Sequence, residues 1–140
     1  MMKGKIKANT VDKYLRPIRK QIVDLIKPDS SVTEYGCGNG DLLFKLSNKI
    51  KTGSGLDNSK QLITYANDKV EKEQVKNLEF KLIDILQYVF LESEQDYAIA
   101  SLLLHVLPWE KAVILVEKMI SSSNTILICG FSEPKNFKQK

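Results

Sequence analysis

A chain of 140 residues, 43% hydrophobic and 27% charged, has the size and composition of one soluble domain and is too apolar for a disordered segment. Its longest apolar stretch, residues 97–107, is shorter than the ~20 residues that cross a bilayer, and residues 1–10 lack the apolar core of a secretory signal. Two cysteines and one histidine are too few for a zinc site or a disulfide framework, so we expect a cytoplasmic protein without a metal. From the length of the chain we expect a single domain over residues 1–140.

The net charge of +4 is concentrated at the start of the chain. Residues 1–27 carry eight Lys and Arg side chains against Asp12 and Asp24. A basic segment can attract nucleic acid, but surface lysines more often keep a protein soluble. We therefore expect a basic helical segment that belongs to the domain, with neither nucleic acid nor a membrane as its partner.

Helical and extended patterns alternate along the chain. Helices are predicted over 17–26, with Pro17 in the first turn, over 41–50, from a cap at Ser59 to about residue 70, and over 109–120. Short strands are predicted over 31–35, 53–56, 78–83, 96–103 and 125–131. Strands separated by helices form right-handed βαβ units, so we expect an α/β fold with a mostly parallel, doubly wound sheet of about five strands.

The strongest local motif is the segment Glu34-Tyr35-Gly36-Cys37-Gly38-Asn39-Gly40-Asp41, between a predicted strand and a predicted helix. Its glycines allow a sharp turn and let a ligand approach bare backbone, and the helix that follows presents unpaired N–H groups. In the dinucleotide pattern GxGxxG the third glycine would stand at Asp41. The alternate spacing of these glycines therefore argues against a dinucleotide.

This alternate spacing, headed by an acidic residue, resembles the first motif of class I S-adenosylmethionine-dependent methyltransferases. Three later segments are similar to the family's second strand, to its motif after strand three, and to its fourth strand with the loop that follows: residues 53–59, 83–85 and 96–108. The resemblance extends from about residue 12 to residue 131 and implies the Rossmann-like methyltransferase strand order.

The resemblance also implies a role for particular residues toward S-adenosylmethionine. It implies that Glu34 orients the ammonium group, that Asp57 accepts hydrogen bonds from the ribose hydroxyls, and that Asp84 and Ile85 contact the adenine. The cofactor-binding residues expected in this way are Glu34, Gly36, Cys37, Gly38, Asn39, Gly40, Asp57, Asn58, Asp84, Ile85 and Ser101. His105 is a weak candidate for a catalytic base, since a lone histidine after an apolar run more often has a packing role.

Two features depart from the family pattern. Residues 121–124 replace a Pro-Gly-Gly turn before strand five, a mild change because serine and asparagine also form turns. The family sheet adds strands six and seven beside strand five, and the residues after Phe131 are too few for them. Strand five would then be an exposed edge. Either another chain completes the sheet, for which we expect self-association or a partner chain, or the chain is a shortened form of a longer protein.

Three functions are compatible with these motifs. The preferred one is methyl transfer to a small-molecule acceptor, whose pocket would be bounded by Tyr14, Arg16, Arg19 and residues 104–109. The second is a non-catalytic cofactor-binding module that works with a partner chain. The third is methylation of nucleic acid or protein; it is disfavoured because the Asn/Asp-Pro-Pro-Tyr/Phe motif of amino-methylating nucleic-acid enzymes is absent.

Overall fold

The computed structural model describes residues 2–87 and 95–130 of the chain. Its five strands form one sheet in the order β3-β2-β1-β4-β5, and every pair of neighbours is parallel. The strands are β1 (Ser31–Tyr35), β2 (Thr52–Asp57), β3 (Leu78–Leu82), β4 (Gln95–Ser101) and β5 (Ser123–Cys129). The predicted α/β fold with a parallel sheet is confirmed.

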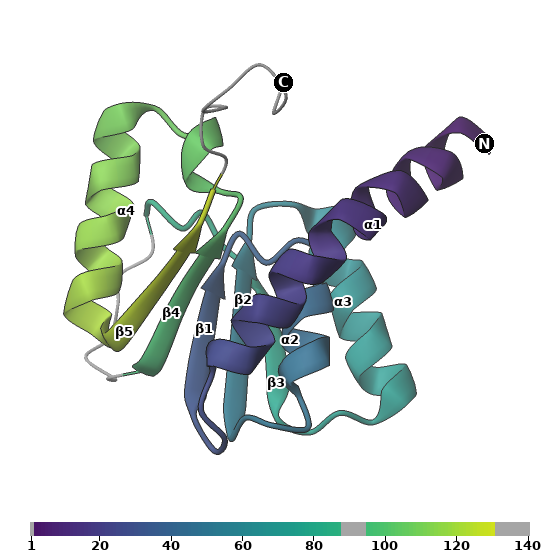
Figure 1. Cartoon of the computed structure of the whole chain (residues 1–140), viewed down its shortest axis with the longest axis horizontal. Helices are drawn as coiled ribbons and strands as arrows, with labels where there is room; N and C mark the ends of the chain where they lie inside the picture. Colours follow the sequence, from purple (N-terminus) through teal and green to yellow (C-terminus); the bar gives the residue numbers. More distant parts are fainter. Residues whose placement is uncertain (1, 88–94, 131–140) are drawn as a thin grey trace.

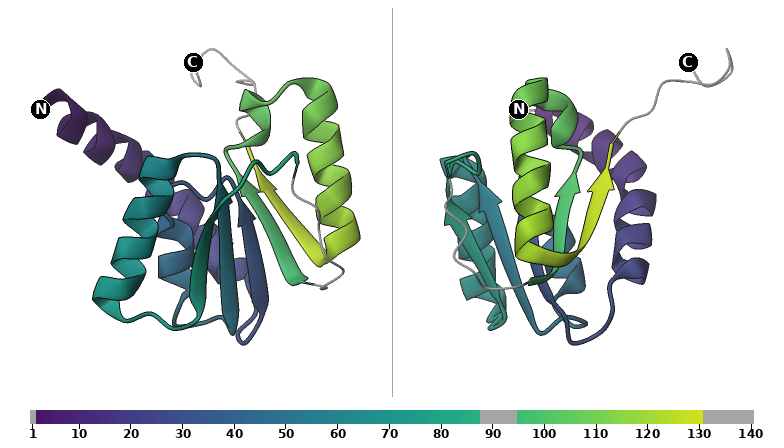
Figure 2. Two further views of the ribbon diagram at one scale, coloured as in Figure 1. Left: turned by 180° about the vertical axis from the view of Figure 1, so that it is seen from behind. Right: turned by 90° about the vertical axis from the view of Figure 1, so that its left-hand side faces the viewer.

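Helices cover both faces of this sheet (Figures 1 and 2). They are α1 (Met2–Leu25), α2 (Asp41–Leu46), α3 (Lys60–Glu73) and α4 (Trp109–Ser122), with the short 3-10 turn η1 (Leu104–Val106) before α4. Helices α1 to α3 bury their apolar sides in one core cluster with β1, and α4 packs in a second cluster on the opposite face. Within the described residues, no helix is long and apolar enough to cross a bilayer.

Several predicted boundaries of the helices are wrong. Helix α1 begins long before Pro17, which lies inside it, because residues 5–16 contain no glycine or proline to stop a helix. Helix α2 ends at Leu46 rather than at residue 50, and the Asn77 side chain donates hydrogen bonds to the carbonyls of Ser47 and Ile50 beyond its end.

Strands β4 and β5 also differ from their predicted limits. Strand β4 ends at Ser101 because Leu102 adopts a left-handed φ of 56° and donates its N–H to the Cys129 carbonyl at 2.8 Å. Strand β5 follows α4 directly, so the turn predicted over 121–124 is absent. Its predicted last residue, Phe131, lies outside the described residues.

Candidate cofactor site

A cavity of about 180 Å³ lies beside the carboxyl ends of β1 and β4. The chain leaves these neighbouring strands in opposite directions, toward β2 from β1 and toward β5 from β4. Such a reversal at the carboxyl edge is where open α/β sheets bind ligands. Six residues predicted for the site line the cavity together: Glu34, Gly36, Cys37, Gly38, Asn39 and Ser101.

The glycine loop passes from β1 into α2 with three residues in the left-handed region, Gly36, Gly38 and Gly40, at φ values of 70°, 56° and 81°. A Cβ atom at Gly40 would lie 2.5 Å from the Phe80 ring, so this glycine permits close packing of α2 against β3. A Cβ atom at Gly38 would meet nothing within 4 Å. Gly40 therefore serves the packing of the loop, and Gly38 leaves open space at the cavity.

Glu34, near the end of β1, is a carboxyl group buried at the inner wall of this cavity. Its side chain is only 4% exposed, and its Oε2 atom has no hydrogen-bond partner. Burial raises the pKa of Glu34 to about 8, although the positive charge of Arg19 acts in the opposite direction. Asp41 and Asp57 raise the same pKa further by like-charge repulsion. Glu34 is therefore not a loop carboxylate that faces solvent.

Asp57, the last residue of β2, holds the glycine loop from the side. Its Oδ2 accepts the Gly38 N–H at 2.9 Å, and its Oδ1 accepts the Ser59 N–H at 2.8 Å. Each carboxylate oxygen has a further lone pair that these bonds leave unused. Asp57 is therefore fixed at the rim of the loop, while its neighbour Asn58 is exposed.

The remaining predicted residues lie outside the 180 Å³ cavity. Asp84 is exposed, and its Oδ1 accepts the Leu86 N–H at 3.0 Å, whereas Ile85 is 8% exposed and packs in the core beneath α4. Cys37 lies in the cavity wall, where burial raises the pKa of its thiol and disfavours the reactive thiolate.

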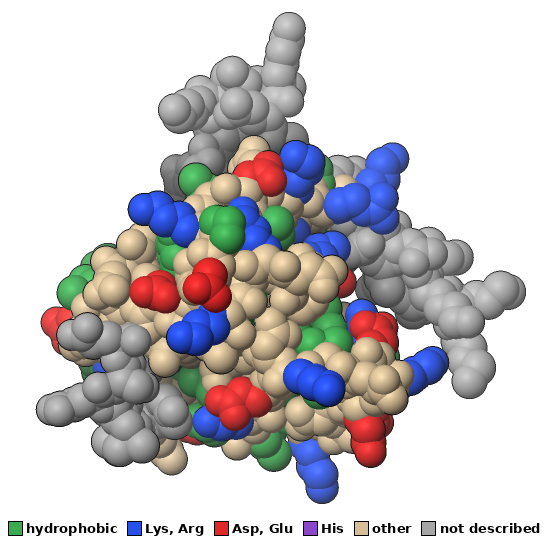
Figure 3. All heavy atoms as spheres, turned by 90° about the horizontal axis from the view of Figure 1, so that it is seen from below, with side chains coloured by type: hydrophobic (Ala, Val, Ile, Leu, Met, Phe, Trp, Pro, Cys, Tyr) green, Lys and Arg blue, Asp and Glu red, His purple; other side chains and the backbone are tan. Residues whose placement is uncertain are grey.

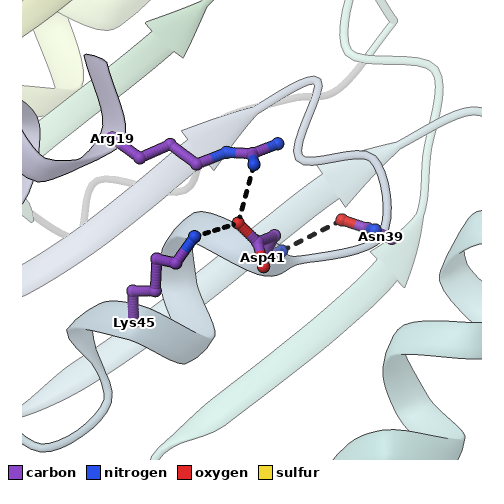
Figure 4. A network of polar contacts seen from close by, with 4 residues as sticks. All are labelled: Arg19, Asn39, Asp41 and Lys45. Atoms are coloured by element: carbon purple, nitrogen blue, oxygen red, sulfur yellow. Dashed lines mark hydrogen bonds and ion pairs between the residues drawn. The ribbon is translucent and has the colours of Figure 1, made fainter. Parts of the chain in front are cut away.

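Leu15, Ile18 and Arg19 of α1 form the outer wall of the cavity. The sequence named only Arg19 among them, and it assigned Arg19 to the acceptor pocket rather than to the cofactor site. The Arg19 guanidinium lies 3.0 Å from Asp41 Oδ2, and Lys45 Nζ lies 2.8 Å from the same oxygen (Figure 4). Asn39 accepts the Asp41 N–H at the start of α2. Helical spacing could have located these residues, since positions 15, 18, 19 and 22 share one face of α1.

His105 lies in a different place. It is exposed and lines a second, largely apolar cavity of about 640 Å³ between η1, α4 and Gly130. Leu107 and Trp109 line this cavity as well, and Trp109 is 79% exposed. Among the described residues, no group of three or more His, Cys, Asp or Glu side chains could hold a metal ion.

Comparison with known proteins identifies the class to which this arrangement belongs. Residues 26–140 match the family model described as a methyltransferase domain. The chain is 35% identical over 74 residues to a probable (S)-tetrahydroprotoberberine N-methyltransferase of Papaver bracteatum. This match covers 51% of the chain and 20% of the plant protein.

Solved structures share the fold. A methyltransferase from Aquifex aeolicus, described as dependent on S-adenosylmethionine, has a TM-score of 0.71 at 18% identity, covering 85% of this chain and 66% of that protein. Magnesium protoporphyrin IX methyltransferase from Synechocystis, solved with bound S-adenosylmethionine, has a TM-score of 0.68 at 21% identity, covering 84% of this chain and 57% of that one. The chain thus spans less than two thirds of each of these three proteins.

Proposed function

The chain belongs to the S-adenosylmethionine-dependent methyltransferase family, and we propose that it binds this cofactor at the glycine loop and transfers its methyl group to a small-molecule acceptor. One observation carries the proposal: a buried carboxyl with an unpartnered oxygen, Glu34, lines a cavity together with residues of a left-handed glycine loop. A buried polar atom without a partner is destabilising, and an ammonium group would supply the missing hydrogen bond.

The other cofactor contacts extend from this point along the carboxyl edge of the sheet. We propose that the unused lone pairs of Asp57 accept hydrogen bonds from the ribose hydroxyls, while the open space beside Gly38 lets the ribose approach. Asp84 and Ile85, after β3, are proposed to contact the adenine. The cavity alone is smaller than the ~300–1,000 Å³ of typical ligand pockets, which suits one end of a cofactor whose remainder lies along the rim.

Methyl transfer needs little from protein side chains. S-adenosylmethionine, held by Glu34 and Asp57, would supply an already activated methyl group to a lone pair of the acceptor and would leave as a neutral thioether. The protein has to hold the two reactants in line, which is worth several kcal/mol on its own. His105 does not line the cofactor cavity, so its position gives no support to a role as catalytic base.

Two observations favour a small molecule over nucleic acid as the acceptor. Basic side chains of α1 have acidic neighbours, since Arg19 pairs with Asp41 and Lys20 pairs with Asp24. The face at which the strands begin, which lies away from the cavity, carries interspersed positive and negative side chains (Figure 3). The plant relative is named for a small-molecule amine, which agrees with this choice.

A cofactor-binding module that works with a partner chain is the second candidate. Within residues 2–87 and 95–130, strand β5 pairs with β4 alone; it carries no charged residue, and Ile128 on it is 46% exposed. An uncharged edge strand favours pairing with another strand. We therefore propose β5 as the contact surface for a second copy or a partner, within a domain that comprises residues 1–140.

Binding and turnover test the proposal separately. We expect calorimetry to detect micromolar binding of S-adenosylmethionine and S-adenosylhomocysteine and no binding of NAD. A preference for NAD would refute the cofactor assignment. Transfer of labelled methyl from the cofactor to a component of a metabolite pool would support catalysis, whereas tight binding without turnover on any acceptor would favour the second candidate.

A further inference from the structure

The cavity beside the glycine loop has a positively charged side chain on its outer wall as well as the carboxyl on its inner wall. Arg19 projects from α1, and only 19% of its side chain is exposed. Figure 4 shows its guanidinium extending from α1 over the first turn of α2. Glu34 lies close enough for the charge of Arg19 to act on it. A carboxyl group and a guanidinium therefore line the same cavity.

Asp41, with which Arg19 forms an ion pair, is also paired with a second cation, Lys45. Asp41 Oδ2 lies 3.0 Å from the Arg19 guanidinium and 2.8 Å from Lys45 Nζ. Lys45 is one helical turn after Asp41, so their ion pair belongs to α2 and does not depend on α1. If the guanidinium turned toward a ligand, Asp41 would keep Lys45 as its counter-ion. The arrangement thus permits Arg19 to bind an anion without leaving an unpaired charge.

We propose that Arg19 binds the carboxylate of the cofactor's amino-acid end, opposite the ammonium at Glu34. This assignment rests on the proposed function, because it requires S-adenosylmethionine in the cavity. An α-amino acid carries an ammonium and a carboxylate on the same carbon, and this cavity offers a carboxyl and a guanidinium across a small space. A guanidinium is well suited to the second role, since its planar N–H groups can bind both oxygens of a carboxylate.

Decarboxylated S-adenosylmethionine provides the decisive test, because it keeps the sulfonium, the ammonium and the adenosine and lacks only the carboxylate. We expect the wild-type protein to bind S-adenosylmethionine more tightly than this analogue. Arg19→Met should lower the affinity for S-adenosylmethionine about tenfold or more and change that for the analogue less than about twofold. Any effect of the variant on Glu34 acts on both ligands through their common ammonium, so the ratio of affinities isolates the carboxylate.

Three controls separate this role from a structural one. Lys20→Met removes a neighbouring positive charge from α1 that is 77% exposed, and it should leave the affinity ratio unchanged. Arg19→Lys should retain part of the preference, since it keeps the charge and loses the planar geometry. Methylthioadenosine, which lacks the whole amino-acid end, should bind wild type and Arg19→Met equally and so report an intact adenosine site.

The outcomes are distinct. Equal losses for S-adenosylmethionine and its decarboxylated analogue in Arg19→Met, or the same change of ratio in Lys20→Met, would overturn the role of Arg19 while leaving the proposed function in place. If the wild-type protein bound neither S-adenosylmethionine nor methylthioadenosine, the proposed function itself would fail.

Discussion

Replacing Glu34 by glutamine should change how the free energy of unfolding depends on pH. Folding raises the pKa of this carboxyl from 4.5 to about 8, because the group is buried. Between these values the unfolded chain has lost the proton and the folded chain has kept it. Unfolding then releases a proton, so the stability of the wild-type protein falls as the pH rises from about 4.5 to about 8.

The magnitude follows from the size of the shift. A difference of about 3.5 pKa units corresponds to about 5 kcal/mol at 1.36 kcal/mol per unit, and it is reached above pH 8. This value is an upper limit, since Glu34 borders a cavity and water there lowers the penalty. Glutamine has a similar shape and does not ionise. The Glu34→Gln variant should therefore gain stability relative to wild type across this pH range.

Urea unfolding at pH 5, 6, 7 and 8 measures the effect, with Glu79→Gln as the matched control. Glu79 accepts a hydrogen bond from the Ser54 hydroxyl at 2.7 Å, which lowers its pKa on folding. The control should thus lose stability relative to wild type at pH values where the unfolded carboxyl is ionised, and should not gain it as the pH rises. A constant difference between Glu34→Gln and wild type from pH 5 to 8 would refute the reasoning, because it would mean that the folded protein holds Glu34 ionised.

Three further substitutions test the cofactor site and the sheet edge. Asp57→Ala should weaken binding of S-adenosylmethionine by about 1.5–3 kcal/mol in calorimetry, since it removes a charged acceptor; unchanged binding with lost stability would make Asp57 purely structural. Gly38→Val should abolish binding, because a branched side chain fills the open space and is strained at a φ of 56°, and an unaltered affinity would show that the loop does not touch the cofactor. Ile128→Lys should convert self-associated protein to monomer in light scattering; a wild-type protein that is already monomeric would contradict association through β5.

The parts of this fold that the sequence could predict are those specified by local patterns. Alternating apolar runs locate the five strands, and glycine at alternate positions anticipates the left-handed residues of the loop. The resemblance to methyltransferases drawn from those positions is confirmed by the family match.

The parts that it could not predict depend on contacts between distant segments. The ion pair of Arg19 with Asp41 joins two helices, and no spacing rule connects the two positions. Leu102 ends β4 through a left-handed conformation that favours glycine, held by a hydrogen bond to Cys129. The sequence also did not predict that Glu34 is buried, because an acidic residue before a glycine turn usually faces solvent.

In the unliganded protein, some residues of the site already have their hydrogen bonds and packing contacts, and Glu34 does not. Asp57 and Gly40 already make the contacts that shape the loop, so their geometry is set by folding. Glu34 instead keeps a buried oxygen without a partner and a pKa displaced upward, both of which oppose folding at neutral pH. An ammonium beside it would favour the ionised form and supply the missing donor. Binding should therefore release a proton near pH 7 and stabilise the fold beyond the effect of the direct contacts, because it relieves a penalty that the unliganded protein carries.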